Sequence, residues 1–87
     1  MDLKLMDGLK NNFYIIRRMN VPGKTAKRLT ALGMIPGTVI FILNKKKSAL
    51  IVAFRGTRFA LGKAVARNIE IEIETEKENI IGNGDKI

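Results

Sequence analysis

The chain has 87 residues, with sixteen lysine or arginine residues against eight acidic ones, which gives a formal net charge of +8. This length allows one small domain with a thin core. The sequence has no cysteine and no histidine, which excludes disulfides, thiolate or imidazole metal sites, and Cys–His or Ser–His nucleophile systems. We therefore predict a protein that is not an enzyme and that has no catalytic residues, no cofactor and no metal site.

The first predicted elements are a leader over residues 1–9 and a strand. Asp7-Gly8 is typical of a turn, and the leader is too short and too charged for a signal peptide. No apolar run approaches the ~18 residues of a membrane span, so we expect a cytoplasmic protein. The run Phe13-Tyr14-Ile15-Ile16 is aromatic or β-branched, which predicts a strand at the start of a domain over residues 10–76.

The next predicted element is a short helix from Ala26 to Leu32. Pro22-Gly23 breaks the preceding strand, and Thr25 is expected to be the N-cap. Leu29 and Leu32 are three residues apart and should share the packed face.

The stretch Gly23-Lys24-Thr25 matches the end of a phosphate-binding loop. The full loop needs a glycine where this chain has Arg18, and Pro22 lacks the N–H donor that such a loop requires. We therefore predict that the match arises by chance and that no nucleotide binds here.

Turn residues then delimit the remaining elements. Gly33 fits the position after a helix that needs a positive φ, and Pro36-Gly37 fits the centre of a type II turn. The predicted strands are Thr38 to Leu43, Ala49 to Phe54 and Phe59 to Leu61, with loops at Asn44 to Ser48 and Arg55 to Arg58. The first two strands are apolar on both faces, so some outward Ile40, Ile42, Ile51 or Ala53 could form an exposed patch that permits weak self-association, unless the helix and leader cover them.

A further helical turn within Gly62 to Asn68 and a last strand from Ile69 to Thr75 complete the prediction. Alternation places Ile69, Ile71 and Ile73 inside and Glu70, Glu72 and Glu74 in water. With Glu76 and Glu78, these carboxylates could form a hard-metal site, but a solvated face is favoured. Residues 77–87 are expected to be a frayed acidic tail. Short strands, tight turns and no βαβ repeat predict a mainly-β fold, a small closed antiparallel sheet.

The charges are unevenly distributed along the chain. No aspartate or glutamate occurs between Gly8 and Ile69, whereas thirteen lysine or arginine residues do. This segment should carry a positive field, which suits an anionic partner.

Several segments together resemble the ferrous-iron transport protein A (FeoA) family. KRLTALGMIPGTVI resembles that family's helix–turn–strand segment, IVAFRGTRFAL its hairpin, and AVARNIEIE its closing helix and last strand. The residues that carry the likeness are Leu29, Leu32, Gly33, Pro36, Gly37, Gly56, Thr57, Ala60 and Leu61. The resemblance implies an SH3-like antiparallel β-barrel with one short inserted helix and a further helical turn before the last strand.

The resemblance also implies a function. Members are small cytosolic accessories of bacterial ferrous-iron uptake, thought to act on the cytoplasmic GTPase region of the membrane transporter, ferrous-iron transport protein B. The same domain occurs in metal-dependent repressors, but this chain shows no helix-turn-helix. The sequence departs from the family in the short basic loop Asn44 to Ser48, at Gly62 and in the non-acidic Ala64-Val65-Ala66.

We hypothesise that a basic surface contacts the partner, with Lys24, Lys27, Arg28, Met34, Arg55 and Arg58 as its residues. The alternative is that these charges are only a solvated face. Lys45-Lys46-Lys47 could likewise meet an anionic membrane surface or remain a soluble loop.

The competing functional class is a basic barrel that binds RNA or single-stranded nucleic acid. The charge favours it, but such proteins stack bases on aromatic side chains. This chain has no tryptophan and one tyrosine, and Phe41, Phe54 and Phe59 lie in apolar strands. Nucleic acid is therefore the less favoured partner, and the same shortage of aromatics argues against a receptor for proline-rich peptides.

Overall fold

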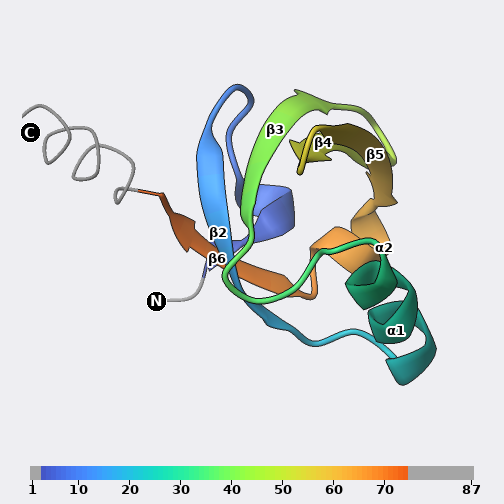
Figure 1. The fold of residues 1–87 in the computed structure, drawn as a ribbon. Coiled ribbons are helices and arrows are strands. Elements are labelled where there is room, and N and C mark those ends of the chain that lie inside the picture. Colours follow the sequence, from blue (N-terminus) through green and yellow to red (C-terminus); the bar gives the residue numbers. More distant parts are fainter. Residues whose placement is uncertain (1–2, 75–87) are drawn as a thin grey trace, which may run out of the picture.

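The computed structural model describes residues 3–74, and its strands form one six-stranded antiparallel sheet (Figure 1). The elements are β1 (Leu3–Lys4), the 3-10 helix η1 (Leu5–Asp7), β2 (Phe13–Met19), α1 (Gly23–Ala31), β3 (Val39–Lys45), β4 (Ala49–Phe54), β5 (Thr57–Gly62), α2 (Lys63–Ala66) and β6 (Ile69–Ile73). The strand order is β1-β6-β2-β3-β4-β5. The predicted mainly-β class, the inserted helix and the later helical turn are confirmed. The two helices lie together beside the curled sheet (Figure 1).

One face of β3 and β4 forms a large part of the core. Ile40 and Ile42 are fully buried with Leu50 and Val52, so the expectation that Ile40 and Ile42 face outward is wrong. Both strands are apolar on both faces, so alternation alone could not assign the inner face. The side chains on the outer face of these strands instead include Phe41, which pairs with Ala53 on β4. Ala53 and Ile51 are half-buried on this outer side.

Helix α1 begins earlier than predicted, at Gly23 rather than Ala26. Pro22 is the N-cap and its carbonyl accepts the first helical hydrogen bond from Ala26 N at 2.8 Å. The prediction that Thr25 caps the helix is therefore wrong, because Thr25 lies inside the first turn and makes no cap hydrogen bond. Proline fixes the backbone φ that the start of this helix needs, and it has no N–H that would be left unpaired. No helix within residues 3–74 is both long enough and apolar enough to cross a membrane.

Helix α1 ends in a Schellman motif that buries Met34. Gly33 has φ +97°, and its N–H donates to Thr30 O at 2.9 Å. Met34 N donates to Leu29 O at 3.0 Å, which satisfies another carbonyl of the last turn and brings these two buried side chains together. The predicted role of Gly33 is confirmed.

The turn after α1 is also confirmed. Gly37 has φ +96°, and Thr38 N donates to Ile35 O at 3.0 Å, which closes the β-turn over Pro36-Gly37. Gly37 N also donates to Ile16 O at 2.7 Å. This hydrogen bond joins the turn after α1 to β2.

Strand β6 is shorter than predicted and its faces are less regular. Ile69 and Ile71 are buried, but Ile73 is 63% exposed, so its predicted inward burial is wrong. Ile73 is the last residue of the strand, at the rim of the sheet. Glu70 does not lie free in water either: its side chain is 14% exposed and it accepts a hydrogen bond from Asn20 Nδ2 at 3.0 Å. The predicted tail over residues 77–87 lies outside the described residues.

The segment before β2 contributes to the same core. β1 pairs with β6, and Leu5 in η1 is fully buried. Gly8 is buried where η1 ends, and its carbonyl accepts a hydrogen bond from Lys45 Nζ at 2.9 Å. The part of residues 1–9 that the structure describes is therefore integral to the barrel.

The Gly8→Ala substitution should destabilise the protein by about 1–3 kcal/mol through overpacking. A Cβ at this position would collide with Ile42 Cδ1 and would lie 3.0 Å from Tyr14 Cε2. The matched control is Gly23→Ala, where a Cβ would have nothing within 4 Å. Urea unfolding should show a lower midpoint for the first variant alone, and equal midpoints would contradict this view of the packing.

Candidate functional site

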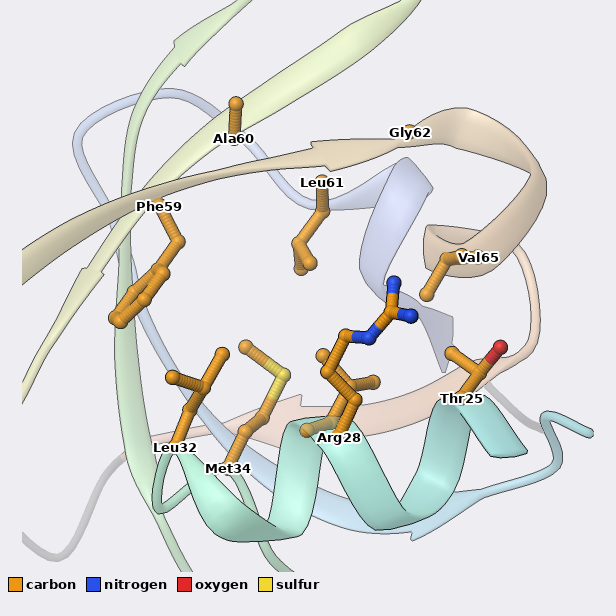
Figure 2. Close-up of a pocket in the computed structure, with 10 residues that line it drawn as sticks. Thr25, Arg28, Leu32, Met34, Phe59, Ala60, Leu61, Gly62 and Val65 are labelled. Carbon is orange, nitrogen blue, oxygen red and sulfur yellow. The ribbon is translucent and has the colours of Figure 1, made fainter. Parts of the chain in front are cut away.

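An apolar cleft lies between α1 and β5, with a volume of about 210 Å³ (Figure 2). It is lined by Thr25, Arg28, Leu29 and Leu32 from α1 and its C-cap, by Met34, by Phe59, Ala60, Leu61 and Gly62 from β5, and by Val65 from α2. This volume exceeds the ~150 Å³ cavity that holds one benzene but is smaller than the ~300 Å³ of the smallest typical small-molecule sites. The cleft is therefore of a size to accept one apolar side chain.

Helical spacing builds one wall of the cleft. Thr25, Arg28, Leu29 and Leu32 follow the i, i+3, i+4, i+7 pattern and so lie along one stripe of the helix. Leu29 at the base of this stripe is buried, and Met34 beneath it is fully buried. Leu32 at the end of the stripe is 44% exposed, although it was predicted to share the packed face with Leu29. Its side chain reaches the mouth of the cleft opposite Phe59 (Figure 2).

Strand alternation builds the other wall. Phe59 and Leu61 pair with Val52 and Leu50 of β4, on the core side of the sheet. Both side chains point into the cleft, whereas Ala60 points the other way (Figure 2). Phe59 also stacks on the buried Phe54, with ring centroids 4.8 Å apart, so its position is fixed by the core.

Among residues 3–74, Arg28 is the only charged residue that lines the cleft. Its guanidinium extends from α1 towards Val65 (Figure 2). Lys24 lies one helical turn before Arg28 on the same side, but Lys27 is 100° further round the helix, away from the cleft stripe. No carboxylate of the described part of the chain lines the cleft. The helical spacing therefore places Lys27 on a different side of α1 from Arg28, with Lys24 between them.

The two remaining predicted cations lie on the β4–β5 hairpin. Arg55 and Gly56 have φ +53° and +79°, which is the geometry of a tight two-residue hairpin turn. The Arg55 side chain covers Gly33: a Cβ added at Gly33 would lie 2.7 Å from Arg55 Cδ. Arg58 pairs with Ala53, so it lies on the outer face of the sheet rather than in the cleft. Of the six residues proposed to contact a partner, Arg28 and Met34 line the cleft, and the role of all six remains a prediction.

The structure adds residues that the sequence reasoning did not assign to binding. Phe59 and Val65 line the cleft, and so does Thr25, which had been placed as a cap. The alternation of Phe59 and Leu61 and the helical stripe that begins at Thr25 were visible signals. What the sequence could not supply was the position of α1 across from β5.

The glutamates of β6 are occupied by other contacts. Glu70 lies 3.6 Å from Lys4 Nζ, and Glu72 lies 3.6 Å from Arg17 Nε. Within residues 3–74, no group of three or more histidine, cysteine, aspartate or glutamate side chains could hold a metal ion. Glu76 and Glu78 lie outside the described residues.

Solved structures of similar fold fall into two groups. The first comprises iron transport proteins: an iron uptake regulatory protein (FeoA) has 23% identity and a TM-score of 0.74, over 83% of this chain and 97% of that one. FeoA from Chlorobium tepidum has 17% identity and a TM-score of 0.80, over 84% and 71% of the two chains. The second group comprises larger repressors, such as a manganese-dependent transcriptional repressor with 13% identity and a TM-score of 0.76. This chain covers 41% of that repressor.

A comparison with curated protein sequences found no match. The model of the FeoA domain family matches residues 4–73, which is most of the chain. The match confirms the family predicted from the sequence motifs, and the FeoA structures confirm the SH3-like fold. FeoA domains are small accessory domains rather than a known family of enzymes. This chain belongs to the FeoA domain family, which implies a role in ferrous-iron transport.

Proposed function

We propose that this protein is a cytoplasmic accessory of ferrous-iron uptake that binds and modulates the cytoplasmic GTPase region of ferrous-iron transport protein B. The observation that carries the proposal is the apolar cleft between α1 and β5, with Arg28 in its wall and no carboxylate from residues 3–74 in its lining. Ferrous iron is the cargo of the transporter in this proposal, and this chain acts by protein–protein contact.

The size and chemistry of the cleft support a protein partner. A pocket of about 210 Å³ accommodates an apolar side chain, and central pockets that receive one anchor residue dominate the energy of many protein interfaces. Phe59, Leu61 and Leu32 offer apolar contact, and Arg28 can pair with a carboxylate beside the anchor. The partner surface should therefore present an aliphatic residue next to an acidic one.

Charge reversal in the cleft wall tests this proposal. Arg28→Glu should weaken binding to the purified GTPase region roughly tenfold, because a rim cation is replaced by a charge that repels an acidic partner. Lys27→Glu is the matched control, because it makes the same charge change at an exposed position of the same helix but away from the cleft. Affinities from calorimetry should differ between the two variants. Equal losses would mean that only net charge matters, and no loss in either variant would contradict the proposed surface.

The nucleic-acid alternative rests on charge alone. Thirteen basic residues and no acidic ones lie between Gly8 and Ile69. Few aromatic faces are open to stack on bases, since Tyr14 and Phe54 are buried and Phe13 packs against Phe41 with ring centroids 4.6 Å apart. Titration with single-stranded RNA at several salt concentrations tests this alternative: tight binding with a steep negative salt slope would favour it over the accessory role.

Recruitment to anionic lipid through Lys45, Lys46 and Lys47 is a separate proposal that vesicle sedimentation would test.

A further inference from the structure

The cleft runs along the open edge of the sheet. β5 is the last strand in the order, so within residues 3–74 it pairs only with β4. Phe54 and Thr57 flank the two-residue turn and pair directly, and the register continues without a bulge to Gly62. Because hydrogen-bonded and non-hydrogen-bonded pairs alternate in antiparallel strands, the backbone groups of Arg58 and Ala60 point away from β4.

These edge groups are free to accept another strand. The N–H and C=O groups of Arg58 and Ala60 have no other hydrogen-bond partner in the described part of the chain. Both residues are exposed. Phe59 and Leu61 alternate with these two residues along β5, and their side chains form a wall of the cleft. The free backbone groups of Arg58 and Ala60 therefore lie directly beside the apolar cleft.

This arrangement suits an extended peptide. A strand laid against β5 would satisfy the groups of Arg58 and Ala60, and its alternate side chains would fall on the core side, where the cleft opens. In such complexes the main chain supplies affinity and the pocket supplies specificity. A helix or a flat surface would fill the cleft but would leave the edge groups unpaired.

The surrounding charge restricts the composition of the peptide. Arg28 lies in the cleft wall, Arg58 lies at the edge itself, and Lys63 begins α2 directly after β5. No acidic residue occurs anywhere in the sequence between Gly8 and Ile69. A peptide with carboxylates flanking an aliphatic anchor complements this edge, whereas a basic peptide is repelled.

We propose that the partner segment adds to β5 as a further strand, inserts one aliphatic side chain into the cleft, and carries acidic residues on either side of it. This inference rests on the proposed function, because it takes the GTPase region as the partner and specifies how that partner is bound. The inference can fail while the proposed function stands, since the complex with the GTPase region can form without strand addition.

Amide exchange on the intact chain tests the inference. In the free protein, the amides of Arg58 and Ala60 should exchange rapidly, and saturation with the purified GTPase region should slow both by at least about tenfold. A complex that leaves these two amides unprotected would overturn strand addition and leave the proposed function standing. The absence of any complex would overturn both. Protection that grows with protein concentration in the chain alone would assign the edge to a second copy instead.

A pair of substitutions at one position gives an independent readout. Ala60→Pro removes the edge N–H but leaves the β4 ladder intact, because this N–H faces away from β4 and Phe59 already has the extended backbone that precedes proline. Ala60→Val keeps the N–H with a side chain of similar size. We expect the proline variant to bind the GTPase region about three- to tenfold more weakly than the valine variant, with both folded by circular dichroism. Equal affinities of the two folded variants would overturn the inference.

Discussion

Replacing Met34 with alanine should lower the free energy of unfolding by about 2–5 kcal/mol. Met34 is fully buried, and it is held under α1 by the hydrogen bond from its N–H to Leu29 O. Truncation removes apolar contact and leaves a cavity that the surrounding strands cannot collapse to fill. Met34 also lines the cleft, so the truncation removes part of the floor of the binding site as well as stability.

The neighbouring residue provides the control for this prediction. Ile35 is 41% exposed, so Ile35→Ala removes a side chain that is already partly in water and should cost much less. Urea unfolding monitored by circular dichroism measures both variants. A Met34→Ala variant as stable as Ile35→Ala would contradict the assignment of Met34 to the core.

Turn chemistry made much of the fold predictable. Gly33, Gly37 and Gly56 all have positive φ, and each lies where the sequence predicts a helix end or a tight turn. Because few residues tolerate that backbone conformation, a glycine in such a context fixes an element boundary. The end of α1 and the β4–β5 hairpin followed from these boundaries.

Other features depended on tertiary contacts that no local pattern encodes. The inner face of β3 could not be read from a strand that is apolar on both sides, and it is set instead by pairing with β2 and β4. Burial of Ile73 was predicted from a correct alternation, but the alternation does not show where the sheet ends. The two-residue strand β1 was not predicted, because its pairing with β6 joins the two ends of the domain.

The site was predictable in part for the same reason. Helical spacing identified Leu29 and Leu32 as one face, and Arg28 was correctly expected to be exposed. The cleft itself arises where α1 approaches β5, and these elements are separated by two strands in the sequence. Only the folded chain therefore distinguishes Arg28 in the cleft wall from Lys27 on the other side of the helix.

Leu32→Gln should weaken binding to the GTPase region about a hundredfold, equivalent to about 2.7 kcal/mol. Leu32 lines the cleft opposite Phe59, so a bound anchor would pack against it (Figure 2). Glutamine has a similar length but loses apolar contact, and it buries an amide that has no partner when the anchor is seated. The net charge of the protein is unchanged, so the effect separates apolar anchoring from electrostatic attraction.

Ile35→Gln is the matched control, because Ile35 is exposed to nearly the same degree, 41% against 44%, and does not line the cleft. Both substitutions replace a half-exposed aliphatic residue near the end of α1 and should leave the unfolding midpoint little changed. Calorimetric titration should then show a large loss for Leu32→Gln and a loss of less than about threefold for Ile35→Gln. If both variants bound equally well, the apolar cleft would not be the anchor site, and the basic residues around it would have to account for recognition of the partner.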